Sequence, residues 1–244
     1  RGDLVSFTEP YEINILENAS GDDLSDLKTI FNDLPLLISN SPKNVGFGGG
    51  HNILATKSTY TTIIIANPDA QIIEPETFKR LLEHLERDPL AAIIGPRLLT
   101  LEHNRFVRNE EAKELYREGK LLQQLWDHGD SFPIMANFAD RLGIARFRQH
   151  KTPTKVNWVS GAFCAIRKND FNEIGGFDES FFFYNEETDL SLRLRQQGRI
   201  ILYDPSIYVA HFYNASLEHN SWKARYYRWT SFLPYWKKHL KKVV

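Results

Sequence analysis

The segment Thr61-Thr62-Ile63-Ile64-Ile65-Ala66-Asn67-Pro68-Asp69 decides the fold of this chain. Its first six residues are β-branched or apolar without alternation, which is typical of a parallel strand that is buried on both faces. Asn67-Pro68-Asp69 is turn chemistry, so the strand is expected to end at Ala66. The sequence therefore predicts a polar turn at the carboxyl end of a buried strand.

Upstream of this segment, strands and helices are expected to alternate. Tyr11–Leu16 and Leu36–Ser39 have strand character, and the leucines from Leu24 onward recur at helical spacing between them, with Asp22 and Asp23 placed to cap that helix. The glycine-rich stretch 44–52 then leads into a helix that is expected to run to about Ser58.

Downstream, the alternation continues. Phe78, Leu81, Leu82 and Leu85 define a helical face, and Ala91–Ile94 is expected to be a strand that Gly95-Pro96 closes. Such a pattern predicts an α/β fold with a doubly wound, mixed and mostly parallel sheet and helices on both faces, whose ligands gather at the carboxyl ends of the strands. Because such a sheet normally opens with a buried strand and residues 1–10 do not resemble one, a first strand before Arg1 is also expected.

The remaining chain divides into three parts. Residues 102–154 have mixed periodicity, and we interpret them as an insertion over the active face within a domain that covers residues 1–215. Strand character resumes at Val156–Ile166, a helix is expected at Leu190–Gln197, and Ile200–Tyr203 and Ile207–Ala210 are expected to be closing strands that deliver His211 at an end. Residues 216–244 form a helical appendage rich in aromatic and basic residues.

Composition limits the function classes. The chain has 30 Lys and Arg against 31 Asp and Glu, so its overall charge gives no argument for nucleic-acid binding. Its only cysteine, Cys164, lies in an apolar run and is expected to be buried, which favours a reducing compartment. The apolar runs are far shorter than the ~20 residues that cross a bilayer. We therefore expect a cytoplasmic protein, or one that lies peripherally on the inner face of the cell membrane.

Seven ordered motifs together resemble family 2 glycosyltransferases, in particular their bacterial rhamnosyltransferase-like branch. They are Glu17-Asn18-Ala19-Ser20, the stretch from Asn44 to Gly50, Asn67-Pro68-Asp69, Trp158-Val159-Ser160-Gly161-Ala162, Gly175-Gly176-Phe177-Asp178, the stretch from Tyr184 to Leu190, and His211. Each motif is short, but their order and spacing are specific, and they cover the chain from Glu12 to about Ser216. The resemblance implies the GT-A fold and a nucleoside diphosphate sugar as the donor.

A divalent cation, Mg²⁺ or Mn²⁺, is the expected cofactor. A leaving diphosphate accumulates negative charge that such an ion can stabilise, and hard oxygen ligands suit it. Asp69 is the best-placed carboxylate, although Asn-Pro-Asp is also simply a turn. The resemblance implies that His211 completes the metal site, and that Asn67, where many relatives have an aspartate, contacts the donor's ribose or a metal-bound water.

The resemblance also implies a catalytic base. An acceptor hydroxyl has a pKa far above neutrality, so inversion by direct displacement needs a carboxylate that takes its proton. The family's base falls on Glu187, and because glutamate replaces the usual aspartate there, Glu186 remains a rival. An acidic start of a solvated helix is the plain alternative for both residues.

The remaining expected site residues bind the donor or the acceptor. The donor-binding set is Glu17, Asn18, Asn44, Gly46, Gly49, Asn52, Asn67 and Asp69, and the set for the sugar or acceptor is Trp158, Ser160, Gly161 and Ala162. Trp158 suits either stacking on a sugar or the core, and the glycines suit either close approach to a nucleotide or a turn.

The function expected from the resemblance is transfer of a sugar, such as rhamnose or another hexose, with inversion. The acceptor is a hydroxyl of a glycan or lipid-linked molecule in surface polysaccharide synthesis. A catalytically inactive sugar-nucleotide or glycan-binding domain and a nucleotidyltransferase are the alternatives. The aromatic and basic tail suits an anionic membrane surface, with a packed terminal helix as the alternative.

Overall fold

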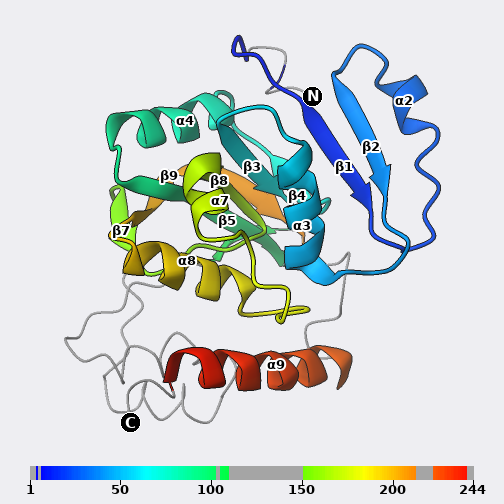
Figure 1. The fold of residues 1–244 in the computed structure, drawn as a ribbon. Coiled ribbons are helices and arrows are strands. Elements are labelled where there is room, and N and C mark those ends of the chain that lie inside the picture. Colours follow the sequence, from blue (N-terminus) through cyan, green and yellow to red (C-terminus); the bar gives the residue numbers. More distant parts are fainter. Residues whose placement is uncertain (1–3, 5–6, 103–104, 110–150, 213–221, 241–244) are drawn as a thin grey trace.

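The computed structural model describes residue 4 and residues 7–102, 105–109, 151–212 and 222–240 (Figure 1). The strands are β1 (Ile13–Glu17), β2 (Leu36–Asn40), β3 (Thr62–Ala66), β4 (Ala70–Ile72), β5 (Ala91–Glu102), β6 (Arg105–Asn109), β7 (Thr154–Val156), β8 (Phe163–Arg167) and β9 (Ile200–His211). The helices are α2 (Leu27–Ile30), α3 (Gly46–Lys57), α4 (Thr77–Arg87), α7 (Lys168–Glu173), α8 (Glu186–Gln196), α9 (Trp222–Tyr235) and the π-helix η2 (Trp236–Leu240). The chain is thus an α/β protein, as predicted.

The sheet is mixed. Its main path runs β3-β8-β5-β9-β4, with β6 pairing with β5 and β7 pairing with β9, while β1 and β2 form a separate parallel pair. The pairing of β5 with β9 is parallel, and β8 lies antiparallel between β3 and β5. Consequently β3, β5 and β9 run in one direction, and their carboxyl ends lie on one side of the sheet. The expectation of a parallel strand buried on both faces is wrong for β3, which pairs antiparallel with β8 at the end of the sheet path and is only partly buried.

Helices cover both faces of this sheet. On one face, Ile93 and Ile166 pack with Phe171 of α7 and Leu190 and Leu194 of α8. On the other, the next residues along the strands, Ile94 and Ala165, pack with Leu81 and Leu85 of α4. Alternation of side chains along β5 and β8 therefore divides the core into two layers. Cys164 is buried in the first layer, as expected.

Some predicted elements have different bounds. Gly95-Pro96 does not end β5, because the strand passes through an irregularity between Pro96 and Arg97 and continues to Glu102. The two expected closing strands are one strand, β9, and residues 157–162 are not strand. Helix α2 is a single turn rather than a full helix. Most of the expected insertion 102–154, and part of the expected appendage 216–244, lie outside the described residues.

Two helices begin earlier than predicted. Helix α3 begins at Gly46, so the glycine-rich stretch is mostly helical rather than a loop. Helix α8 begins at Glu186, so the two candidate bases lie on its first turn. Helix α9 lies below α8 in Figure 1. Among the residues that the structure describes, none of the helices has the length and apolar character to span a membrane.

Candidate active site

The Asp69 carboxylate and the His211 imidazole lie together at the strand ends. Strand β4 pairs with β9 so that Ala70 stands opposite His211, and the amide of Phe212 donates to the carbonyl of Asp69 at 3.0 Å. This places Nε2 of His211 3.2 Å from Oδ1 of Asp69, with side chains only 7% and 13% exposed. Two residues that are 142 positions apart in the sequence thus lie in contact at one edge of the sheet.

These two side chains have the chemistry of cation ligands. Burial lowers the pKa of His211, and the neighbouring Asp69 opposes this shift without reversing it, so the imidazole is neutral at neutral pH. A neutral imidazole nitrogen and a carboxylate oxygen are both good ligands for Mn²⁺ or Mg²⁺. In the described part of the chain no group of three or more His, Cys, Asp or Glu gathers in this way. The remaining ligands of a bound ion would come from the donor or from water.

The turn that carries Asp69 is tied to the segment 158–162. The amide of Asn67 donates to the carbonyl of Ala162 at 2.9 Å, and the amide of Ala70 donates to the carbonyl of Asn67 at 3.0 Å. The amide of Ala162 in turn donates to Oγ of Ser160 at 3.2 Å. Asn67, Ser160 and Ala162 therefore lie beside the Asp69 turn, as expected for residues of one site.

Gly161 connects this corner to the acidic residues of α8. A Cβ placed on Gly161 would lie 2.9 Å from Cζ of Phe47 and 3.8 Å from Cβ of Glu187. Because glycine has no side chain, Phe47 and Glu187 can approach the backbone here. The structure thus brings Glu187, Gly161, Asn67 and, through the turn, Asp69 and His211 into one neighbourhood.

The adjacent Glu186 points elsewhere. It is 4% exposed, and its Cβ lies 3.8 Å from the position of a Cβ on Gly48 of α3. Burial, and next the negative charge of Glu187, raise the pKa of Glu186 well above its ordinary value. The first turn of α8 therefore presents a half-buried Glu187 to the Gly161 side and a buried Glu186 with a raised pKa to α3.

Asn18, Asn44 and Gly46 form a network between the end of β1 and the start of α3. Nδ2 of Asn18 donates to the Gly46 carbonyl at 3.1 Å, and Oδ1 of Asn18 accepts from the Val45 amide at 3.0 Å. Oδ1 of Asn44 accepts from the Gly46 amide at 2.9 Å and from Asn18 at 3.3 Å. Three of the expected donor-binding residues are thus neighbours that fix the start of α3.

The glycines of α3 allow close packing. Gly46 has φ +76°, and a Cβ there would collide with the carbonyl of Phe182. A Cβ on Gly48 would lie 2.8 Å from Cβ of Phe177, and one on Gly49 would lie 3.1 Å from Cβ of Val45. In this structure the small size of Gly46 and Gly48 therefore serves contacts between α3 and the segment that precedes α8, and that of Gly49 leaves room for Val45 at the start of α3.

Two expected donor-binding residues are engaged locally. The carboxylate of Glu17 accepts hydrogen bonds from Ser20 and from the amides of Ala19 and Gly21, and the hydrogen bond from Ser20 is the main cause of its lowered pKa. Nδ2 of the Asn52 side chain donates to the Phe177 carbonyl at 2.9 Å and to Oε1 of Glu179 at 3.0 Å. Both side chains have contacts within the protein that account for their presence.

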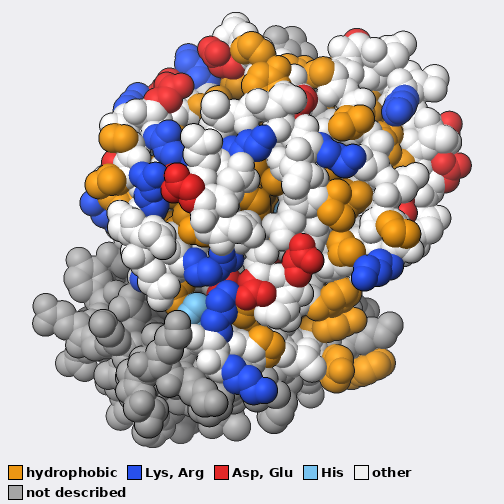
Figure 2. Space-filling view, in the orientation of Figure 1, with side chains coloured by type: hydrophobic (Ala, Val, Ile, Leu, Met, Phe, Trp, Pro, Cys, Tyr) orange, Lys and Arg blue, Asp and Glu red, His pale blue; other side chains and the backbone are white. Residues whose placement is uncertain are grey.

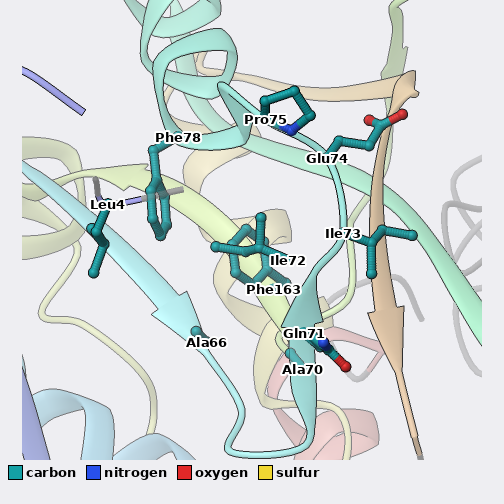
Figure 3. A pocket seen from close by; sticks show the side chains of 10 residues that line it. All are labelled: Leu4, Ala66, Ala70, Gln71, Ile72, Ile73, Glu74, Pro75, Phe78 and Phe163. Atoms are coloured by element: carbon teal, nitrogen blue, oxygen red, sulfur yellow. The ribbon is translucent and has the colours of Figure 1, made fainter. Parts of the chain in front are cut away.

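Two other features lie beside the site. Trp158 is 8% exposed, so little of its ring is open to a ligand in this conformation. A cavity of about 540 Å³ lies between β3, β4 and the start of α4, with Ala66 and Ala70 from either side of the Asp69 turn in its lining (Figure 3). Phe78 and Phe163 make this cavity largely apolar, and it contains none of the expected catalytic or metal-binding residues.

The sequence did not single out the residues that contact the acidic end of α8 from the C-terminal helices. Lys238 and His239 of η2 bind Asp189, and Ser231 of α9 donates to the carbonyl of Phe183. No local pattern distinguishes Lys238 from the other lysines of the tail. These contacts are known only from the three-dimensional structure.

Comparison with known proteins agrees with the resemblance of the motifs. Residues 4–175 match the family model described as Glycosyl transferase family 2. The chain is 30% identical over 149 residues to N-acetylglucosaminyl-diphospho-decaprenol L-rhamnosyltransferase of Mycobacterium tuberculosis, a match over 61% of this chain and 46% of that protein. It is 33% identical over 104 residues to Rhamnosyltransferase WbbL of Escherichia coli, over 40% of this chain and 39% of that protein. The matches thus span about half the length of these relatives or less.

A solved structure shares the fold. The crystal structure of GalNAc-T7 with UDP, GalNAc and Mn²⁺ superimposes with a TM-score of 0.62 at 17% sequence identity, covering 83% of this chain and 38% of that chain. At this identity the likeness shows the fold alone. The predicted GT-A fold is confirmed.

Proposed function

Because the chain belongs to glycosyl transferase family 2, we propose that it is a metal-dependent, inverting glycosyltransferase. It moves a sugar, rhamnose or another hexose, from a nucleoside diphosphate donor to a hydroxyl of a glycan or lipid-linked acceptor in surface polysaccharide synthesis. The observation that carries the proposal is the 3.2 Å contact between Asp69 and His211. The turn that carries Asp69 is hydrogen-bonded through Asn67 to Ala162, and Glu187 lies close to the neighbouring Gly161. Ion ligands and a carboxylate base are the two components that such a transfer requires.

Asp69 and His211 would hold the divalent cation. Both are largely buried, one offers oxygen and the other a neutral nitrogen, and they are already adjacent. The ion supplies electrostatic stabilisation of the leaving diphosphate. Asn18, Asn44 and the start of α3 are proposed to bind the nucleoside part of the donor, because they form one hydrogen-bond network. Asn67, in the turn that carries Asp69, is proposed to contact the donor's ribose or a metal-bound water.

Glu187 is proposed to take the proton of the acceptor hydroxyl. It is half-buried and faces Gly161, whereas Glu186 is 4% exposed beside Gly48 of α3, and burial raises its pKa. A base must be ionised to accept a proton, so the raised pKa of Glu186 disfavours it for this role. Ser160, Gly161 and Ala162 are proposed to border the transferred sugar, with Trp158 packed behind them.

The names of the relatives support the choice of donor and acceptor. One relative is named for L-rhamnose and a diphospho-decaprenol acceptor, and the other is named as a rhamnosyltransferase. A lipid-linked acceptor places the work of the enzyme at a membrane surface. We therefore propose that the protein is cytoplasmic and associates peripherally with the inner face of the membrane through its C-terminal helices.

The first experiment measures release of the nucleoside diphosphate from a panel of nucleoside diphosphate sugars with Mn²⁺ or Mg²⁺ present. Asp69→Ala should abolish turnover, because it removes the charged ligand, while the melting temperature stays close to that of the wild type. His211→Ala should weaken metal dependence more gently, since water can replace a neutral ligand. The exposed variant Glu86→Ala is the control and should behave as the wild type.

Full activity in excess chelator would contradict the metal assignment. Binding of a donor without any turnover would instead favour an inactive sugar-nucleotide binding domain. That second candidate draws on Asn67, which stands where many relatives have an acid and leaves the described part of the site with two cation ligands.

A further inference from the structure

The segment from Asp178 to Asp189, called the acidic segment below, has an unusual backbone just before α8. Tyr184 and Asn185 have φ of 71° and 72°, so two consecutive residues that are not glycine lie in the left-handed region. Asparagine tolerates this region, but a bulky tyrosine is a genuine outlier there. Such a conformation persists only where the surrounding contacts impose it.

Successive carbonyls of this segment are held from two different helices. The carbonyl of Phe182 accepts from the amide of Phe47 in α3 at 3.2 Å. The carbonyl of Phe183 accepts from Oγ of Ser231 in α9 at 2.5 Å. The backbone immediately before Tyr184 is therefore held by α3 at Phe182 and by α9 at Phe183.

Lys238 of η2 joins the two ends of the acidic segment. Its Nζ lies 2.5 Å from Oδ2 of Asp178 and 2.8 Å from Oδ1 of Asp189. Asp189 is fully buried and also binds Nε2 of His239 at 2.6 Å and Nε of Arg193 at 2.7 Å. The ammonium group of Lys238 thus binds both ends of the acidic segment, which contains Glu187. Hydrogen bonds between charged groups are among the stronger ones in proteins.

Aromatic contacts place the C-terminal helices against the same loop. The ring of Phe182 stacks on Tyr227 with centroids 5.3 Å apart, and Phe181 meets Tyr235 at 6.3 Å. Tyr235 is completely buried. Helix α9 and η2 are therefore packed parts of the structure at the acidic segment.

From these contacts we infer that the C-terminal helices position the catalytic base, with Lys238 and Ser231 as positioning residues for Glu187. The inference rests on the proposed function, because it takes Glu187 as the base. Lys238 does not touch the reacting atoms. It keeps the two ends of the acidic segment together, so that the strained turn at Tyr184 and Asn185 directs Glu187 toward Gly161.

The test compares Lys238→Met, which removes the charge and keeps the length, with Lys238→Arg, which keeps the charge. The matched control is Lys237→Met, at the exposed neighbouring lysine. For a folded Lys238→Met we expect kcat to fall about tenfold or more, because small displacements of a base are costly, while the KM for the donor stays within about twofold. Lys238→Arg should restore most of kcat, and Lys237→Met should change neither value.

Hydrogen exchange of residues 182–190 gives a second readout, independent of activity. It should accelerate in Lys238→Met and in Ser231→Ala but not in Lys237→Met. Unchanged kcat and unchanged exchange in a folded Lys238→Met would overturn the inference, as would an equal loss in Lys238→Arg. If the wild type turned over no donor, the proposed function would fail, and the exchange data alone would decide whether Lys238 holds the acidic segment.

Discussion

Glu186 and Glu187 are chemically identical neighbours in two different environments. The first turn of α8 directs one side chain toward α3, where it is buried, and the other toward Gly161, where it is half-buried. Burial disfavours the ionised form and so raises the pKa of Glu186. The direction in which the helix points each side chain thus gives two adjacent positions in the sequence different environments.

This difference makes a prediction about the base. Glu187→Gln keeps the size and hydrogen bonding of the side chain but removes its basicity, so turnover should fall about 100-fold or more with little change in donor affinity. Glu187→Asp should retain more of the rate than Glu187→Gln, because it keeps a carboxylate. Steady-state kinetics with the best donor would measure both, and a larger loss in Glu186→Gln than in Glu187→Gln would transfer the role to Glu186.

The raised pKa of Glu186 also predicts a pH-dependent stability. A carboxyl that binds its proton more tightly in the folded state destabilises that state as pH rises from the ordinary value of 4.5 through the raised pKa. Glu186→Gln removes this titration. Its urea midpoint should therefore move progressively above that of the wild type as the pH rises above 4.5. Glu86→Gln, at an exposed glutamate, is the control, and a gap that stayed constant with pH would contradict the assignment.

At the scale of elements, α3 shows how glycine can serve packing within a helix. Gly48 meets Phe177 at a distance that leaves no room for a methyl group, whereas a Cβ on Gly50 would be 3.5 Å from Leu16, an ordinary contact. Both residues are buried and helical. Replacement of glycine by alanine should therefore lower the stability at Gly48 but not at Gly50.

Gly48→Ala should destabilise the protein by roughly 1–3 kcal/mol, the usual cost of overpacking, because Cβ of Phe177 cannot move without its backbone. Gly50→Ala should be neutral, or should stabilise by up to about 1 kcal/mol through better helix propensity. Urea unfolding of both variants would measure the difference. Equal effects would mean that α3 does not pack against Phe177 as described.

Elements with strong local patterns were predicted well. The position of β3 and the helical face of α4 are confirmed, because each follows from a strong apolar pattern. The predicted character of β3 is wrong, since it pairs antiparallel with β8 and only Ile65 is buried. Predictions failed where tertiary contacts override local signals. Gly95-Pro96 was interpreted as the end of a strand, but pairing with β9 carries β5 past it through an irregularity that tolerates proline.

In the candidate site, too, residues that belong to local motifs were predicted, whereas contacts between distant parts of the chain were not. The motifs placed Asp69 and His211 at strand ends, and the pairing of β4 with β9 brings them into contact. The start of α8 was not predicted, since it follows two left-handed residues that only the surrounding contacts impose. Nor could the role of Lys238 be predicted, because it depends on carboxylates that are far away along the chain.

At the scale of the whole molecule, the C-terminal helices have two sides. One side packs on the acidic segment through Ser231, Tyr235 and Lys238. At the start of α9, Trp222 and Tyr226 are 73% and 57% exposed, and Phe182, which stacks on Tyr227, is 38% exposed. Figure 2 shows hydrophobic side chains gathered over this end of α9. Exposed aromatic residues next to a lysine-rich tail suit the interface of an anionic membrane.

Because η2 also contacts the acidic segment, a truncation of the tail would mix two effects, and substitutions at the exposed aromatic residues test membrane association more directly. The double variant Trp222→Ser, Tyr226→Ser should bind anionic vesicles roughly tenfold more weakly, or weaker still, because both side chains lose apolar contact with the lipid. Turnover of a water-soluble acceptor should be unchanged, since neither residue is among those proposed to bind the donor, the metal ion or the acceptor.

The matched control removes exposed hydrophobic side chains elsewhere. Ile30 and Leu90 are 59% and 51% exposed, so Ile30→Ser, Leu90→Ser also deletes exposed apolar surface, far from α9 in the sequence. Vesicle sedimentation at low salt and at about 0.5 M salt separates the contributions, because salt screens the attraction of the lysines and leaves the aromatic contacts in place. A difference between the two double variants that survives high salt would assign the aromatic contribution to α9. Equal vesicle binding by both variants and the wild type at low salt would instead show that this face does not meet the membrane.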